Sequence, residues 1–265
     1  MGEEKKRYGF TNRGMFNWVM LHRTDLCARM LTVILGIDID DVKVRQEESM
    51  EPGLDAKRAI LDIKAYSNGR VFDIEMQAAK KGNLARRARY YQSTLDAASL
   101  EKGSDYKQLP ENYVIFICKD DYLGYGEPLL HFTMSCEVND ICESLELRDG
   151  RHVMFISASL YNQIEEEQGT ASHSLYELMR FISTGKAGED DLARELEKAV
   201  KEANEDEGAR MFITQESEIA EWQKALEEKT SENESLKNRL AKSEAENEML
   251  RNKLAKTAKN SASTQ

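Results

Sequence analysis

The chain has 265 residues, of which 40% are hydrophobic and 32% are charged. No run approaches the roughly 18 consecutive apolar residues that a membrane helix needs, and the first ten residues lack the apolar stretch of a secretory signal. We therefore expect a soluble, cytoplasmic protein with no membrane contact. The formal net charge of -11 argues against a broad basic surface for nucleic acid, although local basic patches can still bind it.

The N-terminal part predicts helices followed by a strand. Apolar residues recur at helical spacing over residues 14–35, and Asp25 marks a possible break into two helices. Val42 and Val44 then alternate with polar residues, as in a half-buried strand.

The next segment, RAILDIKAYSNGRVFDIEMQ (58–77), predicts a β-hairpin. Its Asn-Gly turn is flanked by apolar runs, and this is a strong short-range hairpin signal. Each run contains an acidic residue, Asp62 in the first and Glu75 in the second, and strand pairing would bring them close together. Two close carboxylates repel each other unless a hard divalent cation binds them. The alternative is an exposed hairpin face whose acids are solvated.

The middle of the chain alternates predicted helices and strands. An amphipathic helix covers residues 83–101, and residues 112–119 form an almost continuous apolar run, typical of a strand buried on both faces. Further strands and helices are predicted at 129–136, 152–160, 172–183 and 189–203. This pattern indicates an α/β domain with helices on both faces of a mixed sheet.

The C-terminal part has a heptad pattern. Mostly apolar residues recur seven apart in two series: Ile219, Leu226, Asn233, Leu240, Asn247 and Leu254, and Trp222, Lys229, Leu236, Ser243 and Leu250. Lys229 and Ser243 weaken the second series. Asn233 and Asn247 in the first series fit a two-stranded coiled coil, because buried amides pair well there. We therefore expect a homodimer; one long solvated helix is the alternative reading.

The order of the acids in the hairpin matches a known motif. An acid in one strand is followed, about a dozen residues later, by acid-x-(Lys or similar) at the end of the next; here these are Asp62 and Glu75-Met76-Gln77. The flanking segments TNRGMFNWVM, DLCARMLTVILG and RRARYYQSTLDAASLEKGSDY make the match more specific. Residues 11–165 together resemble the PD-(D/E)xK nuclease family transposases, also called the recombination-promoting nuclease (Rpn) family.

This resemblance implies a restriction-endonuclease-like α/β/α core with a mixed sheet, followed by a C-terminal coiled-coil helix. The expected parts are a nuclease-like core, a helical extension, a coiled coil and a disordered tail, at residues 11–165, 166–210, 211–257 and 258–265.

The resemblance also implies a metal-dependent DNA endonuclease, with family links to mobile elements, recombination and phage defence. Asp62 and Glu75 would bind Mg²⁺ or Mn²⁺, together with the backbone carbonyl of Met76. The ion would polarise the phosphoryl oxygen and lower the pKa of a bound water. Gln77 stands where many relatives have lysine, and it can orient water without adding charge.

Other residues near the motif are candidates for supporting roles. The expected DNA contacts, which could instead form a solvated basic face, are Lys57, Arg58, Arg86, Arg87 and Tyr90. Tyr91, on the same helix, is a further candidate for phosphate contacts and for bracing the site, or it lies partly in the core. The expected supporting acids are Asp73, Glu47 and Glu48.

One residue departs from the family pattern. Arg13 stands where the family's first helix usually has an acid. If that acid aids metal binding or catalysis, the chain could instead be a catalytically inactive nuclease fold that acts as a dimeric binding or assembly module.

Overall fold

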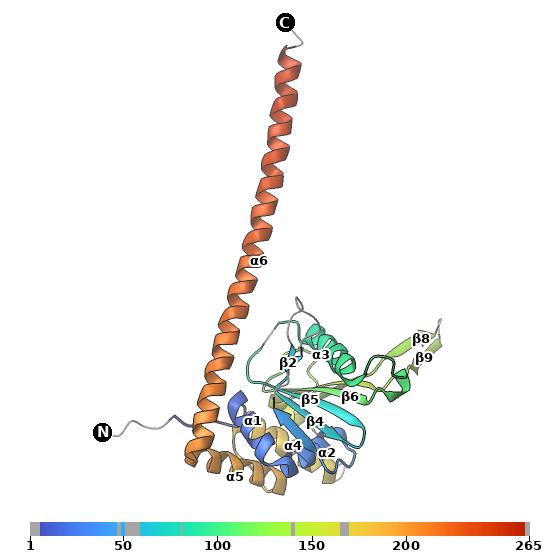
Figure 1. The fold of residues 1–265 in the computed structure, drawn as a ribbon, viewed down its shortest axis with the longest axis vertical. Coiled ribbons are helices and arrows are strands. Elements are labelled where there is room, and N and C mark those ends of the chain that lie inside the picture. The colour runs from blue at the N-terminus through green and yellow to red at the C-terminus, as the bar shows by residue number, and fades with distance from the viewer. Residues whose placement is uncertain are drawn as a thin grey trace, which may run out of the picture. The chain divides into compact units, whose positions relative to one another are not determined.

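The computed structural model (Figure 1) describes residues 6–46, 49–50, 59–80, 82–138, 141–164 and 170–262. The chain divides into two compact units, Met1–Ser217 and Glu218–Gln265. The long helix α6 (Glu207–Ala262) begins in the first unit and continues through the second.

Two short helices open the described chain, as the sequence predicts. They are α1 (Arg13–His22) and α2 (Thr24–Leu35). Asn12 caps α1, because its side-chain oxygen accepts a hydrogen bond from the backbone N–H of Met15 at 3.1 Å. The cap fixes Arg13 as the first residue of α1 and therefore fixes the backbone position from which its side chain extends.

The first unit is built on a six-stranded mixed sheet. The strand order is β1 (Lys43–Gln46), β4 (Ile63–Ser67), β5 (Arg70–Gln77), β6 (Glu111–Cys118), β10 (Arg151–Ser157) and β7 (Leu129–Phe132). The three central strands β5, β6 and β10 run parallel, and the pairs β1–β4, β4–β5 and β7–β10 are antiparallel. This confirms the prediction of a mixed sheet, and all but the first residue of β6 are buried, as expected for a central strand.

The predicted hairpin is formed by β4 and β5. Asn68 and Gly69 both have positive φ, at 48° and 74°, as a two-residue turn of type I′ requires. The first strand starts later than predicted, because residues 59–60 form β3 (Ala59–Ile60), which pairs with β2 (Ser49–Met50) in a separate ladder. Asp62 therefore lies at a bend just before β4 and not inside a strand.

Helices cover both faces of the sheet, also as predicted. The α3 helix (Leu84–Ser99) packs on one face over a cluster that includes Val114 and Phe116. On the other face, α1 and α2 pack with α4 (Thr170–Thr184) and α5 (Asp191–Glu205) around Phe72 and Ile115. Figure 1 shows these two helical layers on opposite sides of the strands. The helices predicted at 172–183 and 189–203 correspond to α4 and α5.

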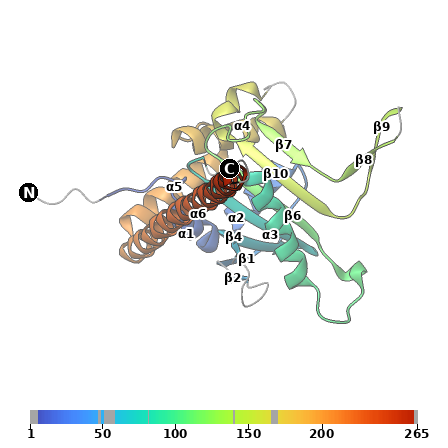
Figure 2. The same ribbon diagram turned by 90° about the horizontal axis from the view of Figure 1, so that it is seen from above.

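Some elements of the middle segment differ from the prediction. The strand predicted at 129–136 is divided between β7 and β8 (Ser135–Val138), and β8 pairs with β9 (Ile141–Glu146) in a separate hairpin. Figure 2 shows this hairpin projecting away from the main sheet. The strand predicted at 152–160 ends at Ser157 and is followed by the 3₁₀ helix η2 (Ala158–Gln163); another, η1 (Tyr106–Gln108), precedes β6.

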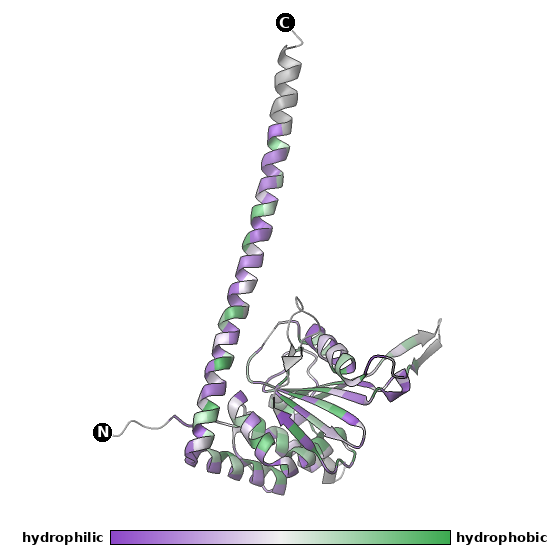
Figure 3. Cartoon of the chain, in the orientation of Figure 1, coloured by the Kyte–Doolittle hydropathy of each residue, from purple (hydrophilic) through white to green (hydrophobic). Residues whose placement is uncertain are grey.

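The α6 helix changes environment along its length. Ala209 and Ile213 are fully buried in the core cluster of the first unit. In the second unit, apolar residues of the predicted heptad series are exposed, for example Leu226 and Leu240. Figure 3 shows scattered hydrophobic positions on the mostly hydrophilic α6. The long helix is confirmed, whereas the coiled coil stays a prediction. In the described part of the chain, no helix is long and apolar enough to cross a membrane.

Candidate active site

Asp62, just before β4, lies opposite Glu75, near the end of β5. Ile63 pairs with Ile74 in an antiparallel ladder, so Asp62, which precedes Ile63, faces Glu75, which follows Ile74. The backbone N–H of Asp62 donates to Glu75 Oε1 at 2.9 Å, and the backbone N–H of Met76 donates to Asp62 Oδ2 at 3.1 Å. Both side chains are buried. The prediction that the hairpin brings these two acids together is confirmed.

Each of the two carboxylates has an arginine partner. Arg13 on α1 places its Nε 2.7 Å from Asp62 Oδ1. Arg87 on α3 places an Nη atom 3.1 Å from Glu75 Oε2. Because α1 and α3 cover opposite faces of the sheet, the acid pair receives one positive charge from each helical layer.

Arg87 also organises the residues next to Glu75. Its guanidinium donates to Gln77 Oε1 at 3.1 Å and to the Tyr91 hydroxyl at 3.0 Å. The Gln77 amide in turn donates to the Met76 carbonyl at 3.3 Å. Gln77 adds no charge of its own, so the positive charge at this position of the motif comes from Arg87.

Asp73 adds a third carboxylate to the same face of β5. It is fully buried, and neither of its oxygens has a hydrogen-bond partner in the described part of the chain. Burial, together with the nearby charges of Glu75 and Asp62, raises the pKa of Asp73 well above its usual range. Burial and the charge of Asp62 likewise raise the pKa of Glu75 to about 8. Burial and the repulsion between carboxylates therefore outweigh the attraction of Arg87 at Asp73 and Glu75.

The chemistry of these donors fits a hard divalent cation. Such ions take carboxylate and carbonyl oxygens, and a cation beside Asp62 and Glu75 would offset the repulsion that raises the pKa of Glu75. Within the described ranges, no group of three or more His, Cys, Asp or Glu is arranged to hold a metal ion. The fit therefore rests on two carboxylates and the Met76 carbonyl, and a cation at Asp62 Oδ1 would displace Arg13.

The other predicted residues divide into two groups. Arg86 is exposed on α3, Tyr90 is half-buried against the α3-side cluster, and the Arg87 side chain is only 23% exposed because it reaches into the site. The rest fall outside the described residues: Lys57, Arg58, Glu47 and Glu48.

Sequence reasoning missed one contact of the site. It treated Arg13 only as a missing acid, whereas the side chain forms an ion pair with Asp62. It named Tyr91, with its neighbours on the same helix, as a candidate for bracing the site, and the hydroxyl of Tyr91 accepts a hydrogen bond from Arg87. The signal for this contact is that residues four apart on a helix share a face.

Comparison with known proteins agrees with this geometry. Residues 22–238 match the family model of the PD-(D/E)XK nuclease family transposases. The match begins after Arg13 and continues through α4 and α5 into α6, further along the chain than the expected 11–165. No curated protein and no solved structure matches the chain. Because the family match covers most of the chain and contains the Asp62–Glu75 pair, the chain belongs to the PD-(D/E)XK nuclease family transposases.

Proposed function

We propose that the chain is a divalent-metal-dependent endonuclease that hydrolyses DNA phosphodiesters. Family membership supports a nuclease-like function. The observation that carries the proposal is the buried Asp62–Glu75 pair, in which each carboxylate accepts a hydrogen bond from a backbone N–H of the opposite strand. These bonds fix both side chains before any substrate binds, as a preorganised site requires.

Asp62, Glu75 and the Met76 carbonyl would hold Mg²⁺ or Mn²⁺. When bound, the ion supplies Lewis-acid polarisation of the phosphoryl oxygen and a water of lowered pKa. Arg87 contributes a fixed guanidinium beside Glu75, suited to the charge of a phosphate group. Tyr91 and Gln77 hold that guanidinium in place through its other N–H groups.

The second unit supports a proposal about assembly. Leu226, Leu240 and Leu250 are exposed to at least 56% and belong to the two heptad series. A second copy of the same helix would cover them, with Asn233 and Asn247 pairing across the seam. We therefore include a homodimer through the C-terminal coiled coil in the proposed function. The proposed links to mobile elements and phage defence rest on the family resemblance alone.

Metal-dependent cleavage of supercoiled plasmid DNA tests the proposal. Purified wild-type protein is incubated with Mg²⁺, with Mn²⁺ or with a chelator, beside Asp62→Asn and Glu75→Gln variants whose folding is checked by circular dichroism. Nicking or linearisation by wild type alone, and only with metal, supports the endonuclease. Equal behaviour of the folded variants and wild type would exclude it.

The Arg13–Asp62 ion pair favours a second candidate function, a nuclease fold without catalysis that acts as a dimeric binding module. In that reading Arg13 neutralises the position at which a metal would bind. The same assay separates the two functions, since a binding module without catalysis leaves the plasmid intact under every metal condition.

A further inference from the structure

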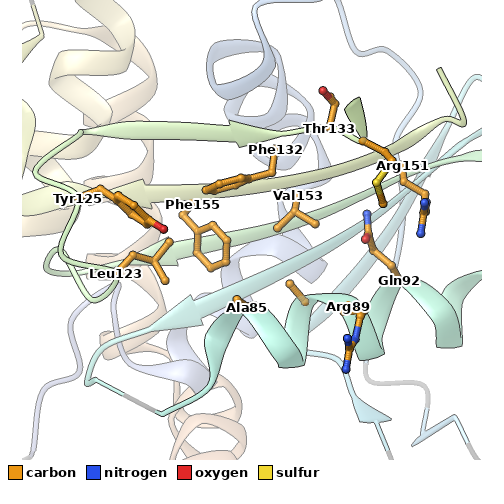
Figure 4. A pocket seen from close by; sticks show the side chains of 12 residues that line it. Ala85, Arg89, Gln92, Leu123, Tyr125, Phe132, Thr133, Arg151, Val153 and Phe155 are labelled. Carbon is orange, nitrogen blue, oxygen red and sulfur yellow. The ribbon is translucent and has the colours of Figure 1, made fainter. Parts of the chain in front are cut away.

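A groove lies on the α3 face of the sheet, on the flank of α3 opposite to Arg87. Its volume is about 330 Å³, and it is bounded by α3, by β10 and by residues 123–134. Figure 4 shows Phe132, Val153 and Phe155 along the strands and Ala85 on the helix. The small side chains of Ala85 and Ala88 leave space between the helix and the strands, which a longer side chain would fill.

Large apolar groups line this groove and are partly exposed. Tyr125 is 65% exposed, Phe132 is 42% exposed and Met134 is 48% exposed. Exposed aromatic side chains that surround a concave surface are typical of a binding site. The volume is at the lower end of the usual range for ligand pockets, roughly 300–1,000 Å³. A partner helix, about 10–12 Å across, needs more room than this.

The charged groups of the groove favour an anionic ligand. Arg89 stands on the α3 wall and Arg151 on β10, and none of the described residues that line the groove is acidic. Arg151 is paired with Asp149, with its Nε 2.7 Å from Oδ2. Arg89 is exposed and forms no ion pair within the described ranges. In a chain of net charge -11, Arg89 is therefore the lining arginine that is a local match for phosphate.

A continuous series of ring contacts joins the groove to the candidate site. The Arg87 guanidinium lies 5.4 Å from the centre of the Phe116 ring. Phe116 stacks on Phe155 with ring centres 5.2 Å apart, and Phe155 meets Phe132 edge-on at 5.9 Å. The rings of Phe116 and Phe155 are buried beneath α3, and Arg87 and Arg89 project from opposite flanks of that helix, so α3 separates the groove from the candidate site on the same face of the sheet.

We propose that this groove holds an unpaired base of the bound DNA, stacked on Tyr125 or Phe132 with a phosphate at Arg89. Bases stack on aromatic side chains whatever their sequence, and basic residues track the backbone. The inference rests on the proposed function and adds the substrate class: DNA with single-stranded or locally unpaired character.

Fluorescence anisotropy in chelator tests the groove without cleavage. The full chain is titrated into a labelled single-stranded oligonucleotide and into the matching duplex. The double variant Tyr125→Ala, Phe132→Ala removes two exposed rings, and Tyr106→Ala, at a tyrosine that is 80% exposed outside the groove, is the matched control. We expect tighter binding of the single strand by wild type and by the control, and a loss of about tenfold or more in the double variant, as removal of base stacking predicts.

Three results would overturn the inference: preference of wild type for the duplex, equal single-strand affinity of wild type and the double variant, or an altered solution mass of the double variant. The last would indicate that a second copy covers the groove. The proposal of nuclease activity can fail separately, since DNA binding measured in chelator needs no catalysis. Plasmid cleavage that survives in the double variant while single-strand affinity falls supports both proposals.

Discussion

The centre of the candidate site is a cluster of three buried acids. Asp62 and Glu75 are each paired with an arginine, but Asp73 has no hydrogen-bond partner in the described part of the chain. The sequence predicted both acids of the pair, because a local hairpin brings them together. It did not predict the position of Arg13, since the contact with Asp62 joins residues 49 apart in sequence and depends on how α1 packs.

The Arg13–Asp62 pair leads to a prediction about metal affinity. A cation must displace Arg13 from Asp62 Oδ1, so Arg13→Ala should bind Mn²⁺ roughly tenfold more tightly, equal to about 1.4 kcal/mol. The measurement is the rise in melting temperature with increasing Mn²⁺. Arg29→Ala is the matched control, because Arg29 pairs with the exposed Asp191 at 2.8 Å. Equal Mn²⁺ responses in wild type and Arg13→Ala would contradict this competition.

A histidine pair at the opposite end of the strands predicts acid sensitivity. His152 Nδ1 lies 2.9 Å from His131 Nε2. Burial and the charge of His131 lower the pKa of His152 below its usual value; Glu111, Asp149 and Arg70 are the other charged neighbours. The unfolded chain therefore binds more protons here, and stability is lost as the pH falls through about 6.5 toward the folded pKa.

The raised pKa values of Glu75 and Asp73 act in the opposite direction over this range, and they do so equally in wild type and in a His152 variant. We therefore expect the melting temperature of His152→Gln to rise relative to that of wild type as the pH falls from about 7.5 to about 5.5. His173→Gln, at an exposed histidine, serves as control and should follow wild type. A constant difference between His152→Gln and wild type over this range would show that the histidine pair is not the source of the effect.

At the scale of elements, local signals predicted best where the chain forms its own contacts. The Asn68-Gly69 turn and the buried β6 strand follow from nearby residues. The β8–β9 hairpin was missed, because residues 135–146 include four acids and lack clear apolar alternation. A hairpin that projects from the sheet has little core to bury, so its sequence need not show the pattern of a buried strand.

The close contact between α1 and the start of α6 predicts that one methyl group added at Gly14 lowers the stability of the protein. A Cβ at Gly14 would lie 2.7 Å from the Ile213 carbonyl oxygen, so one backbone has to shift. Gly14→Ala should lower the free energy of unfolding by about 1–3 kcal/mol, the usual cost of overpacking. Gly9→Ala is the control, since a Cβ there meets nothing within 4 Å. Urea denaturation measures both, and an unchanged midpoint for Gly14→Ala would show that the two helices do not pack this closely.

At the scale of the whole molecule, the family match and the compact units end at different places. The match reaches residue 238, whereas the first unit ends at Ser217. Part of α6 beyond the core therefore belongs to the family pattern. The heptad series predicted this helix from its apolar spacing, but no pattern in one chain measures whether two chains associate.

If the proposed dimer forms, disrupting its coiled-coil interface should lower the mass measured in solution. Leu226→Asp with Leu240→Asp places two charges in the first heptad series and should convert a dimer into a monomer. Met249→Asp is the matched control, because Met249 is 59% exposed and lies outside both series. Light scattering of the full-length proteins gives the mass. A double variant with the same mass as wild type would exclude the coiled coil as the dimer interface.

The most direct test of the central claim is the DNA cleavage rate of Asp62→Asn, Glu75→Gln and the double variant in Mg²⁺ or Mn²⁺. If the two carboxylates act as one unit, each single substitution lowers the rate by roughly 100-fold or more, and the double variant is no slower than the slower single. Losses that simply multiply in the double variant, or a folded single variant that cuts as fast as wild type, would contradict a shared site at Asp62 and Glu75.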